Sequence, residues 1–212
     1  MPIILLKLTY PLIFLYFYAK ITLMQQEIRN NIKNLRKSLD SATANSLSSI
    51  IIDKVLGLKE IKQNDTFMVY NSLKTEVQTD RLITALKSQN KTVAYPITVG
   101  DDMVAGVPCG SNGYKKSNLG VIEPLEYTVL DSPSVVIVPL VACDKNLNRI
   151  GMGKGYYDRY LSGKSAIKIG ICYDFQVVDK IIPNKTDIPL DIIITEKQIL
   201  RSKSYENFSN RQ

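Results

Sequence analysis

The feature that most constrains the fold is a set of short apolar segments separated by stretches with helical periodicity. Each apolar segment is rich in β-branched or aromatic residues, so each predicts a buried β-strand. Strands that alternate with helices indicate βαβ units and a mostly parallel sheet covered on both faces. The sequence therefore predicts the α/β class, in a three-layer α/β/α arrangement. The expected strands are residues 66–70, 92–96, 134–139, 167–172 and 191–195.

Helical patterns precede and separate these strands. Apolar residues recur at helical spacing between residues 28 and 39, and again from Leu47 to Leu58. Thr79 with Asp80 is typical of a helix N-terminus. Residues 100–127 are richer in Gly, Pro and polar residues, so we expect a small antiparallel insertion there. The first helix has its apolar stripe at Ile28, Ile32, Leu35 and Leu39, and its basic residues Arg29, Lys33, Arg36 and Lys37 lie mostly off that stripe.

Residues 1–23 form an apolar segment that is interrupted by Lys7, Thr9 and Pro11. Its longest unbroken apolar run, residues 12–19, is shorter than the roughly 20 residues that a membrane-spanning helix needs. Three interpretations stay open: a weak membrane anchor, a targeting segment, or a translated leader upstream of a start at Met24. We favour the leader, and expect residues 24–212 to form one domain to which residues 1–23 do not contribute.

The composition excludes several kinds of catalytic chemistry. The 212 residues include no histidine, so this chain has no Ser-His-Asp or Cys-His nucleophile, no His-ligated zinc and no imidazole base. Three cysteines without a CxxC pair indicate a reducing compartment, and we expect a cytoplasmic protein. The net charge of +7 favours anionic partners, which include both phosphorylated metabolites and nucleic acid.

The most informative segment is a glycine-rich run, NRIGMGKGYYDRY, at residues 148–160. Glycines at alternate positions let backbone N–H groups converge on an anion, and a helix expected just after them adds its positive end. Arg149 and Lys154 add full charges, and Asp158 is close enough to hold a Mg²⁺ shared with phosphates. The run therefore predicts a triphosphate-binding loop.

Two well-known phosphate motifs do not fit this run. A P-loop needs Ser or Thr after its lysine, whereas Gly155 follows Lys154. The dinucleotide fingerprint is GxGxxG directly after a strand, whereas here the spacing is GxGxG and the preceding strand is expected to end near Pro139. A flexible loop with a capping glycine remains the alternative to an anion site.

The run NRIGMGKGYYDRYL, with VIVPLVACD upstream, resembles the signature of the 5-formyltetrahydrofolate cyclo-ligase (5,10-methenyltetrahydrofolate synthetase) family. Gln25 stands where the family usually has lysine, and Thr186 stands where it often has histidine. Shorter segments resemble further elements of the family in the same order, and the resemblance spans residues 25–195. These segments are the basic helix from Ile28, YNS at 70–72, EVQT at 76–79, GVIEP at 120–124, and DIPLD at 187–191 with Ile194 and Thr195.

The resemblance implies an enzyme that closes 5-formyltetrahydrofolate to 5,10-methenyltetrahydrofolate at the expense of ATP, with Mg²⁺. In that family the formyl oxygen is phosphorylated, N10 attacks the activated carbon, and phosphate leaves. Phosphoryl transfer depends on positioning and charge neutralisation more than on acid–base groups, which suits a chain without histidine.

The resemblance also implies roles for individual residues. Catalysis falls to Lys154, Arg149 and Tyr156, with Lys154 stabilising the transferring phosphoryl group. Glu76 accepts pterin N–H bonds, with Asn71 beside it, and the loop from Met152 to Tyr156 also contacts folate. Asp158 and Asp191 hold Mg²⁺. ATP is bound by Arg29 and by the loop residues Arg149, Ile150, Gly151, Met152, Gly153, Lys154, Gly155, Tyr156 and Tyr157.

Two functions of other classes stay open. The net charge and the basic helix also fit a nucleic-acid-binding module, although no RRM, KH or helix-turn-helix pattern occurs. A membrane-tethered folate-binding protein without activity would keep the fold, but the intact charged loop favours an enzyme. We expect small-molecule substrates, no nucleic acid partner, no stable membrane association and a monomer.

Overall fold

The computed structural model describes residues 3–110, 113–117, 120–203 and 205, with side chains from residue 15 onward. Its centre is an eight-stranded sheet in the order β13-β12-β10-β7-β1-β2-β3-β6. These strands are β1 (Thr66–Val69), β2 (Thr92–Val99), β3 (Asp102–Pro108), β6 (Tyr127–Val129), β7 (Val135–Val138), β10 (Ile167–Ile171), β12 (Ile192–Ile194) and β13 (Ile199–Arg201).

The middle of this sheet is parallel. β1 lies between β2 and β7, and β10 lies between β7 and β12, with all four pairings parallel. β13 at one edge, and β3 with β6 at the other, are antiparallel. The prediction of an α/β fold with a mostly parallel sheet is confirmed, and all five expected strands occur, with β2 continuing to Val99.

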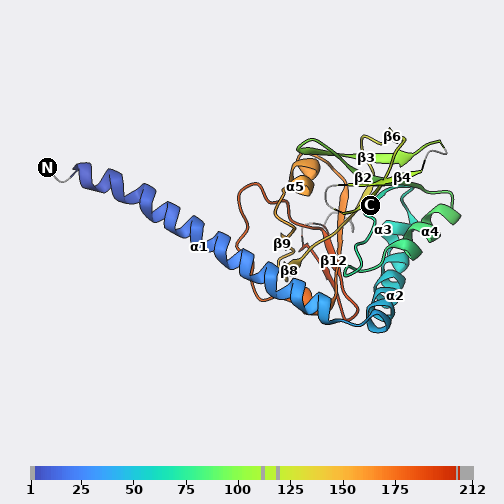
Figure 1. The fold of residues 1–212 in the computed structure, drawn as a ribbon, viewed down its shortest axis with the longest axis horizontal. Helices are drawn as coiled ribbons and strands as arrows, with labels where there is room; N and C mark the ends of the chain where they lie inside the picture. The colour runs from blue at the N-terminus through green and yellow to red at the C-terminus, as the bar shows by residue number, and fades with distance from the viewer. Residues whose placement is uncertain (1–2, 111–112, 118–119, 204, 206–212) are drawn as a thin grey trace.

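Successive residues of the parallel strands belong to two hydrophobic cores, one on each face of the sheet. In β7, Val135 and Ile137 belong to the first core, and Val136 and Val138 belong to the second. Both faces are therefore covered, as the unbroken apolar segments predicted. Helices α2, α3 and α4 lie on one side and α5 lies on the other (Figure 1). Their bounds are α2 (Ser41–Gly57), α3 (Lys59–Lys62), α4 (Asp80–Ser88) and α5 (Tyr156–Leu161), with a 3₁₀ turn at Asp174–Gln176.

Two smaller sheets complete the strand set. β8 (Ala142–Asp144) pairs with β9 (Arg149–Ile150) and with β11 (Val177–Val178). β4 (Tyr114–Lys116) and β5 (Ile122–Pro124) form a hairpin between β3 and β6. This hairpin and the antiparallel β2–β3–β6 ladder confirm the insertion expected around residues 100–127.

Helix α1 (Ile3–Ser38) is longer than the sequence pattern suggested, and its first half projects away from the rest of the molecule (Figure 1). Leu15, Tyr16, Phe17 and Tyr18 are each more than half exposed there. In the described residues, no helix is long and apolar enough to cross a membrane.

The buried face of α1 differs from the predicted apolar stripe. Leu35 is 44% exposed, whereas Gln25 and Arg36 are less than 10% exposed, together with Ile32. The predicted stripe was wrong at Leu35, because α1 buries Gln25 at the cavity described below and Arg36 against the segment that carries Thr75 and Glu76.

Candidate active site

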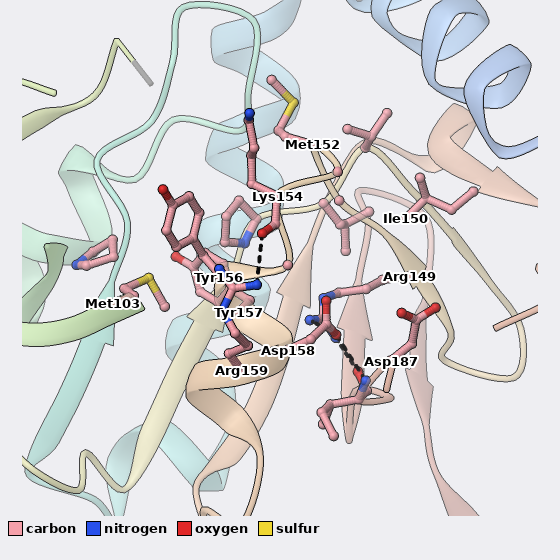
Figure 2. Close-up of a pocket in the computed structure, with 18 of the residues that line it drawn as sticks. Met103, Arg149, Ile150, Met152, Lys154, Tyr156, Tyr157, Asp158, Arg159 and Asp187 are labelled. Atoms are coloured by element: carbon pink, nitrogen blue, oxygen red, sulfur yellow. Dashed lines mark hydrogen bonds and ion pairs between the residues drawn. The ribbon is translucent and has the colours of Figure 1, made fainter. Parts of the chain in front are cut away.

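The main cavity, of about 810 Å³, opens at the carboxyl ends of the parallel strands β1, β2 and β7. This is the edge at which open parallel sheets bind ligands. The glycine-rich run and residues 184–188 form a further part of the wall (Figure 2). At the ends of β1, β2 and β7, the residues that line it include Tyr70, Asn71, Pro96, Thr98, Pro139 and Leu140.

Residues 149–155, which we name the glycine loop, comprise β9 and the turn that joins it to α5. Gly153 and Gly155 have φ angles of 97° and 70°, which residues with a side chain rarely adopt. A Cβ atom at Gly155 would also lie 2.8 Å from Arg159 Nη1. The loop conformation therefore depends on glycine, and α5 begins directly after it, as expected.

Arg149 and Asp158 form an ion pair with each other. Arg149 Nη2 lies 2.7 Å from Asp158 Oδ1. Arg149 also donates to the carbonyl of Ile188, whose N–H donates to the same Asp158 oxygen at 3.0 Å. Arg149 is therefore not the free cation that the sequence suggested. It fixes Asp158, whose Oδ2 has no hydrogen bond among the described residues.

The other two predicted cations also reach the glycine loop. Arg29 Nε donates to the Gly151 carbonyl at 2.9 Å, and its Nη2 donates to Gln25 Oε1 at 3.3 Å, so α1 is joined to the loop. Lys154 is exposed at the cavity and extends away from Arg149 and Asp158 (Figure 2). Among the described residues the Lys154 ammonium has no acceptor, which leaves it available to an anion.

The other predicted residues of the glycine-rich run divide between the cavity and the core. The Tyr156 hydroxyl donates to the Gly100 carbonyl at 3.3 Å, and Arg159 lies over its ring. The Tyr157 hydroxyl is buried without a partner in the part of the chain that the structure describes, and burial raises its pKa. Ile150 is 2% exposed in a core cluster, whereas Met152 is 53% exposed at the rim.

Glu76, in the segment between β1 and α4, lines the cavity as predicted from the resemblance. Its Oε2 accepts the Leu73 N–H at 2.9 Å, and its Oε1 lies 3.5 Å from Arg36 Nη2. Burial raises the pKa of this carboxyl, and the Leu73 N–H and the Arg36 charge oppose that shift.

Arg36 is a site residue that the sequence pattern missed. Its side chain is 4% exposed and its Nε donates to the Thr75 carbonyl at 2.8 Å, so it holds the segment that carries Glu76. It therefore does not belong to a solvated basic face of α1, which weakens the nucleic-acid interpretation.

The structure does not bring Asp191 to this cavity. Asp191 precedes β12, at the amino ends of the parallel strands, and its carboxylate lies 2.8 Å from Lys168 Nζ. It also accepts the Lys168 N–H. The prediction that it shares a Mg²⁺ with Asp158 is therefore wrong, because the two carboxylates face opposite ends of the sheet.

Asp187 reaches the cavity instead. It lies beside Arg149 and Asp158 (Figure 2) and lines the cavity with Asn184 and Ile188. Both Asp187 and Asp191 belong to the DIPLD segment, and spacing alone did not say which of the two faces inward. In the described part of the chain, no cluster of three or more Cys, Asp or Glu forms a ready metal cage.

Two further carboxylates, to which the sequence pattern gave no role, lie near the site. Asp144 is 0% exposed and accepts the backbone N–H groups of Asn146, Asn148 and Ile181, so it fixes the turn that leads to the glycine loop. The DKNLN sequence carried this signal, because Asp often accepts from backbone N–H groups two or more residues later. Glu123 in β5 is 2% exposed and lines the cavity.

Comparison with known sequences agrees with the resemblance. The model of the 5-formyltetrahydrofolate cyclo-ligase family matches residues 21–196. The 5-formyltetrahydrofolate cyclo-ligase of Haemophilus influenzae is 30% identical over 184 residues, which cover 82% of this chain and 98% of that protein. The corresponding protein of Mycoplasma pneumoniae is 28% identical over 174 residues, covering 80% and 97%.

Solved structures with this fold carry the same names. The 5,10-methenyltetrahydrofolate synthetase of Aquifex aeolicus superposes with a TM-score of 0.76 at 28% identity, covering 85% of this chain and 93% of that one. The synthetase of Mycoplasma pneumoniae gives 0.66 at 27% identity, covering 81% and 98%. Since the family match spans most of the sequence and the fold agrees, the chain belongs to the 5-formyltetrahydrofolate cyclo-ligase family, a family of ligases.

Proposed function

We propose that this enzyme converts 5-formyltetrahydrofolate and ATP to 5,10-methenyltetrahydrofolate, ADP and phosphate. The observation that carries the proposal is one cavity lined both by an available cation, Lys154, and by a buried carboxylate, Glu76. A polyphosphate and a pterin can therefore be held together in one cavity, which favours transfer between them. Three free cysteines fit a place in the reducing cytoplasm.

ATP would lie against the glycine loop. Its phosphates would accept hydrogen bonds from backbone N–H groups of residues 151–155, whose conformation is fixed by Gly153 and Gly155. Arg29 lies against the same loop and Gln25 orients its guanidinium. Lys154 would meet the transferring phosphoryl group, where its charge counts most because charge builds up there in the transition state.

Asp158 and Asp187 are the residues that would hold Mg²⁺. This ion is commonly bound by one or two carboxylates with substrate phosphates and water, so a full protein cage is not needed. Asp158 keeps one oxygen without a hydrogen bond among the described residues, and the Arg149 pair holds that oxygen in place. When bound, Mg²⁺ would neutralise charge on the β- and γ-phosphates.

The pterin would lie against Glu76. An ionised carboxylate accepts two N–H groups, which matches the 2-amino group and N3–H of the pterin edge. Arg36 and the Leu73 N–H favour the ionised form against the effect of burial. Tyr156, held by Gly100 and Arg159, would line the cavity near the formyl group.

The chemistry then needs two bond exchanges. The formyl oxygen takes the γ-phosphoryl group, and the bond to ADP breaks. N10 attacks the activated formyl carbon, forming the new C–N bond and losing its proton, and the C–O bond to phosphate then breaks. The chain supplies charge and position rather than a base, which agrees with its lack of histidine.

The test is direct. Purified protein with 5-formyltetrahydrofolate, ATP and Mg²⁺ should form the methenyl product and release one ADP per turnover. The product is detected by its near-ultraviolet absorbance. Omitting ATP should abolish the signal. Well-folded protein that forms no methenyl product would contradict the proposal.

A further inference from the structure

Two glutamates of this chain are equally buried but differ in their partners. Glu60 and Glu123 are each 2% exposed. Glu60 Oε1 lies 2.6 Å from Arg201 Nη1 and accepts the Tyr205 hydroxyl at 3.3 Å. For Glu123, no lysine or arginine of the described residues forms an ion pair. A buried carboxylate without a cation lowers stability unless other donors satisfy it.

The donors available to Glu123 satisfy it only in part. Its Oε1 accepts the Thr98 hydroxyl at 3.0 Å and, at 3.4 Å, the Thr98 N–H. Its Oε2 has no hydrogen bond within residues 15–110, 113–117 and 120–203. This oxygen is not among the fully buried atoms without a partner in the described residues, and Glu123 lines the cavity, so a donor of a bound ligand can reach it.

Glu123 is also held at the cavity by its neighbours. It lies on the β4–β5 hairpin and lines the wall together with Val121 and with Thr98 of β2. Asn71, at the end of β1, donates to the Ile122 carbonyl at 2.6 Å, so the hairpin is tied to the strand end that precedes the Glu76 segment. Glu76 and Glu123, which we name the acidic wall, therefore reach one cavity from separate parts of the chain.

We propose that Glu123 is a second pterin-binding carboxylate, which accepts N8–H of the reduced ring. This inference rests on the proposed function. A tetrahydropterin carries N–H donors at the 2-amino group, N3, N5 and N8, and in 5-formyltetrahydrofolate the formyl group replaces the N5 hydrogen. If Glu76 takes the 2-amino and N3 hydrogens, N8–H on another edge still needs an acceptor, and Glu123 supplies one.

The assignment makes Glu123 a specificity residue for the oxidation state of the ring. In an oxidised pterin N8 carries a lone pair and no hydrogen. A carboxylate facing it would meet a second acceptor, which is unfavourable for that ligand. The acidic wall would thus select reduced folates before any chemistry occurs.

The test compares two ligands that differ only in reduction. Binding of tetrahydrofolate, kept reduced under anaerobic conditions, and of folic acid is measured by calorimetry on the full chain without ATP. We expect tetrahydrofolate to bind more tightly. Glu123→Gln should lower that preference by about 10-fold or more, because it removes a charged hydrogen bond. Glu123→Asp keeps the charge but shortens the side chain, so the carboxylate lies further from the ligand and the preference should fall as well.

Glu60→Gln is the matched control. It should lower the melting temperature by breaking the Arg201 pair and leave the ligand preference unchanged. Glu123→Gln should melt at or above the wild-type temperature, whereas a merely structural glutamate would lower it. An unchanged preference, or an equal loss for both ligands, overturns the N8 assignment even if the methenyl product forms. Failure of the wild type to bind either pterin overturns the proposed function and this assignment together.

Discussion

The glycine loop and the acidic wall line one cavity but are built differently. The loop is a single run of sequence, and the spacing of its glycines and charged residues already predicts its geometry. The acidic wall takes Glu76 from the segment after β1 and Glu123 from the β4–β5 hairpin, and Arg36 of α1 supports it. The spacing of residues within the loop was enough to predict an anion site, whereas Glu76 was assigned only through the resemblance and Glu123 was not assigned at all.

The largest effect is expected on the loop side. Lys154→Met should lower turnover by roughly 100-fold or more, on the scale of losing one preorganised electrostatic donor. The effect on ATP affinity should be smaller, since the backbone and Arg29 remain. Turnover and the KM for ATP, measured together, separate the two. Lys180→Met, a change of the same kind at a lysine outside the cavity wall, is the control. Normal turnover in Lys154→Met would remove that residue from the chemistry.

Loss of a carboxylate from the acidic wall should weaken the binding of folate rather than that of ATP. Glu76→Ala leaves pterin N–H donors unpaired, at a cost of about 1–3 kcal/mol, so the folate KM should rise about 5- to 100-fold. The KM for ATP should change less. Equal loss for both substrates would point to a folding defect and would erase the distinction between the two sides.

Three substitutions test whether Asp187 rather than Asp191 joins Asp158 in binding Mg²⁺. Asp158→Asn and Asp187→Asn should each raise the Mg²⁺ concentration needed for half-maximal rate, by about 10-fold for one lost charged ligand. Asp191→Asn should leave that requirement unchanged and lower the melting temperature slightly, because it loses the Lys168 pair. A raised Mg²⁺ requirement in Asp191→Asn alone would restore the original assignment.

A subtler effect is expected from Arg36. Burial raises the pKa of Glu76, and the Arg36 charge opposes that shift. The ionised carboxylate is the form that accepts N–H bonds, so folate affinity should fall as pH drops through this pKa. Arg36→Gln removes the opposing charge, and the midpoint should move to higher pH. Arg36→Lys keeps the charge and should keep the midpoint, even though the Thr75 contact is lost. The same midpoint in all three proteins would reduce Arg36 to a structural role.

The sequence predicted the parts of the fold that depend on local pattern. Unbroken apolar segments gave the parallel strands, and the glycine spacing placed the loop between β9 and α5. It could not predict which side of α1 is buried, because Arg36 and Gln25 are buried through contacts with residues far along the chain. It also chose Asp191 over Asp187, since only the path of residues 182–191 across the end of the sheet decides which carboxylate meets the cavity.

The smallest effect is expected from removing residues 1–23, because the first half of α1 projects away from the rest of the molecule (Figure 1). Leu15 to Tyr18 are each at least 55% exposed, so this part of α1 contributes little burial to the fold. The first tie between α1 and the cavity is Gln25, which donates to the Ile182 carbonyl at 3.2 Å and accepts from Arg29. A chain that begins at Met24 keeps this tie. It should therefore melt within a few degrees of the full chain and retain full turnover, measured by calorimetry and by methenyl formation. A chain that begins at Gln26 should instead bind ATP more weakly, because Arg29 loses its orienting partner. If the Met24 chain lost activity while the Gln26 chain lost no more, the projecting helix rather than Gln25 would be the part of α1 that the site requires.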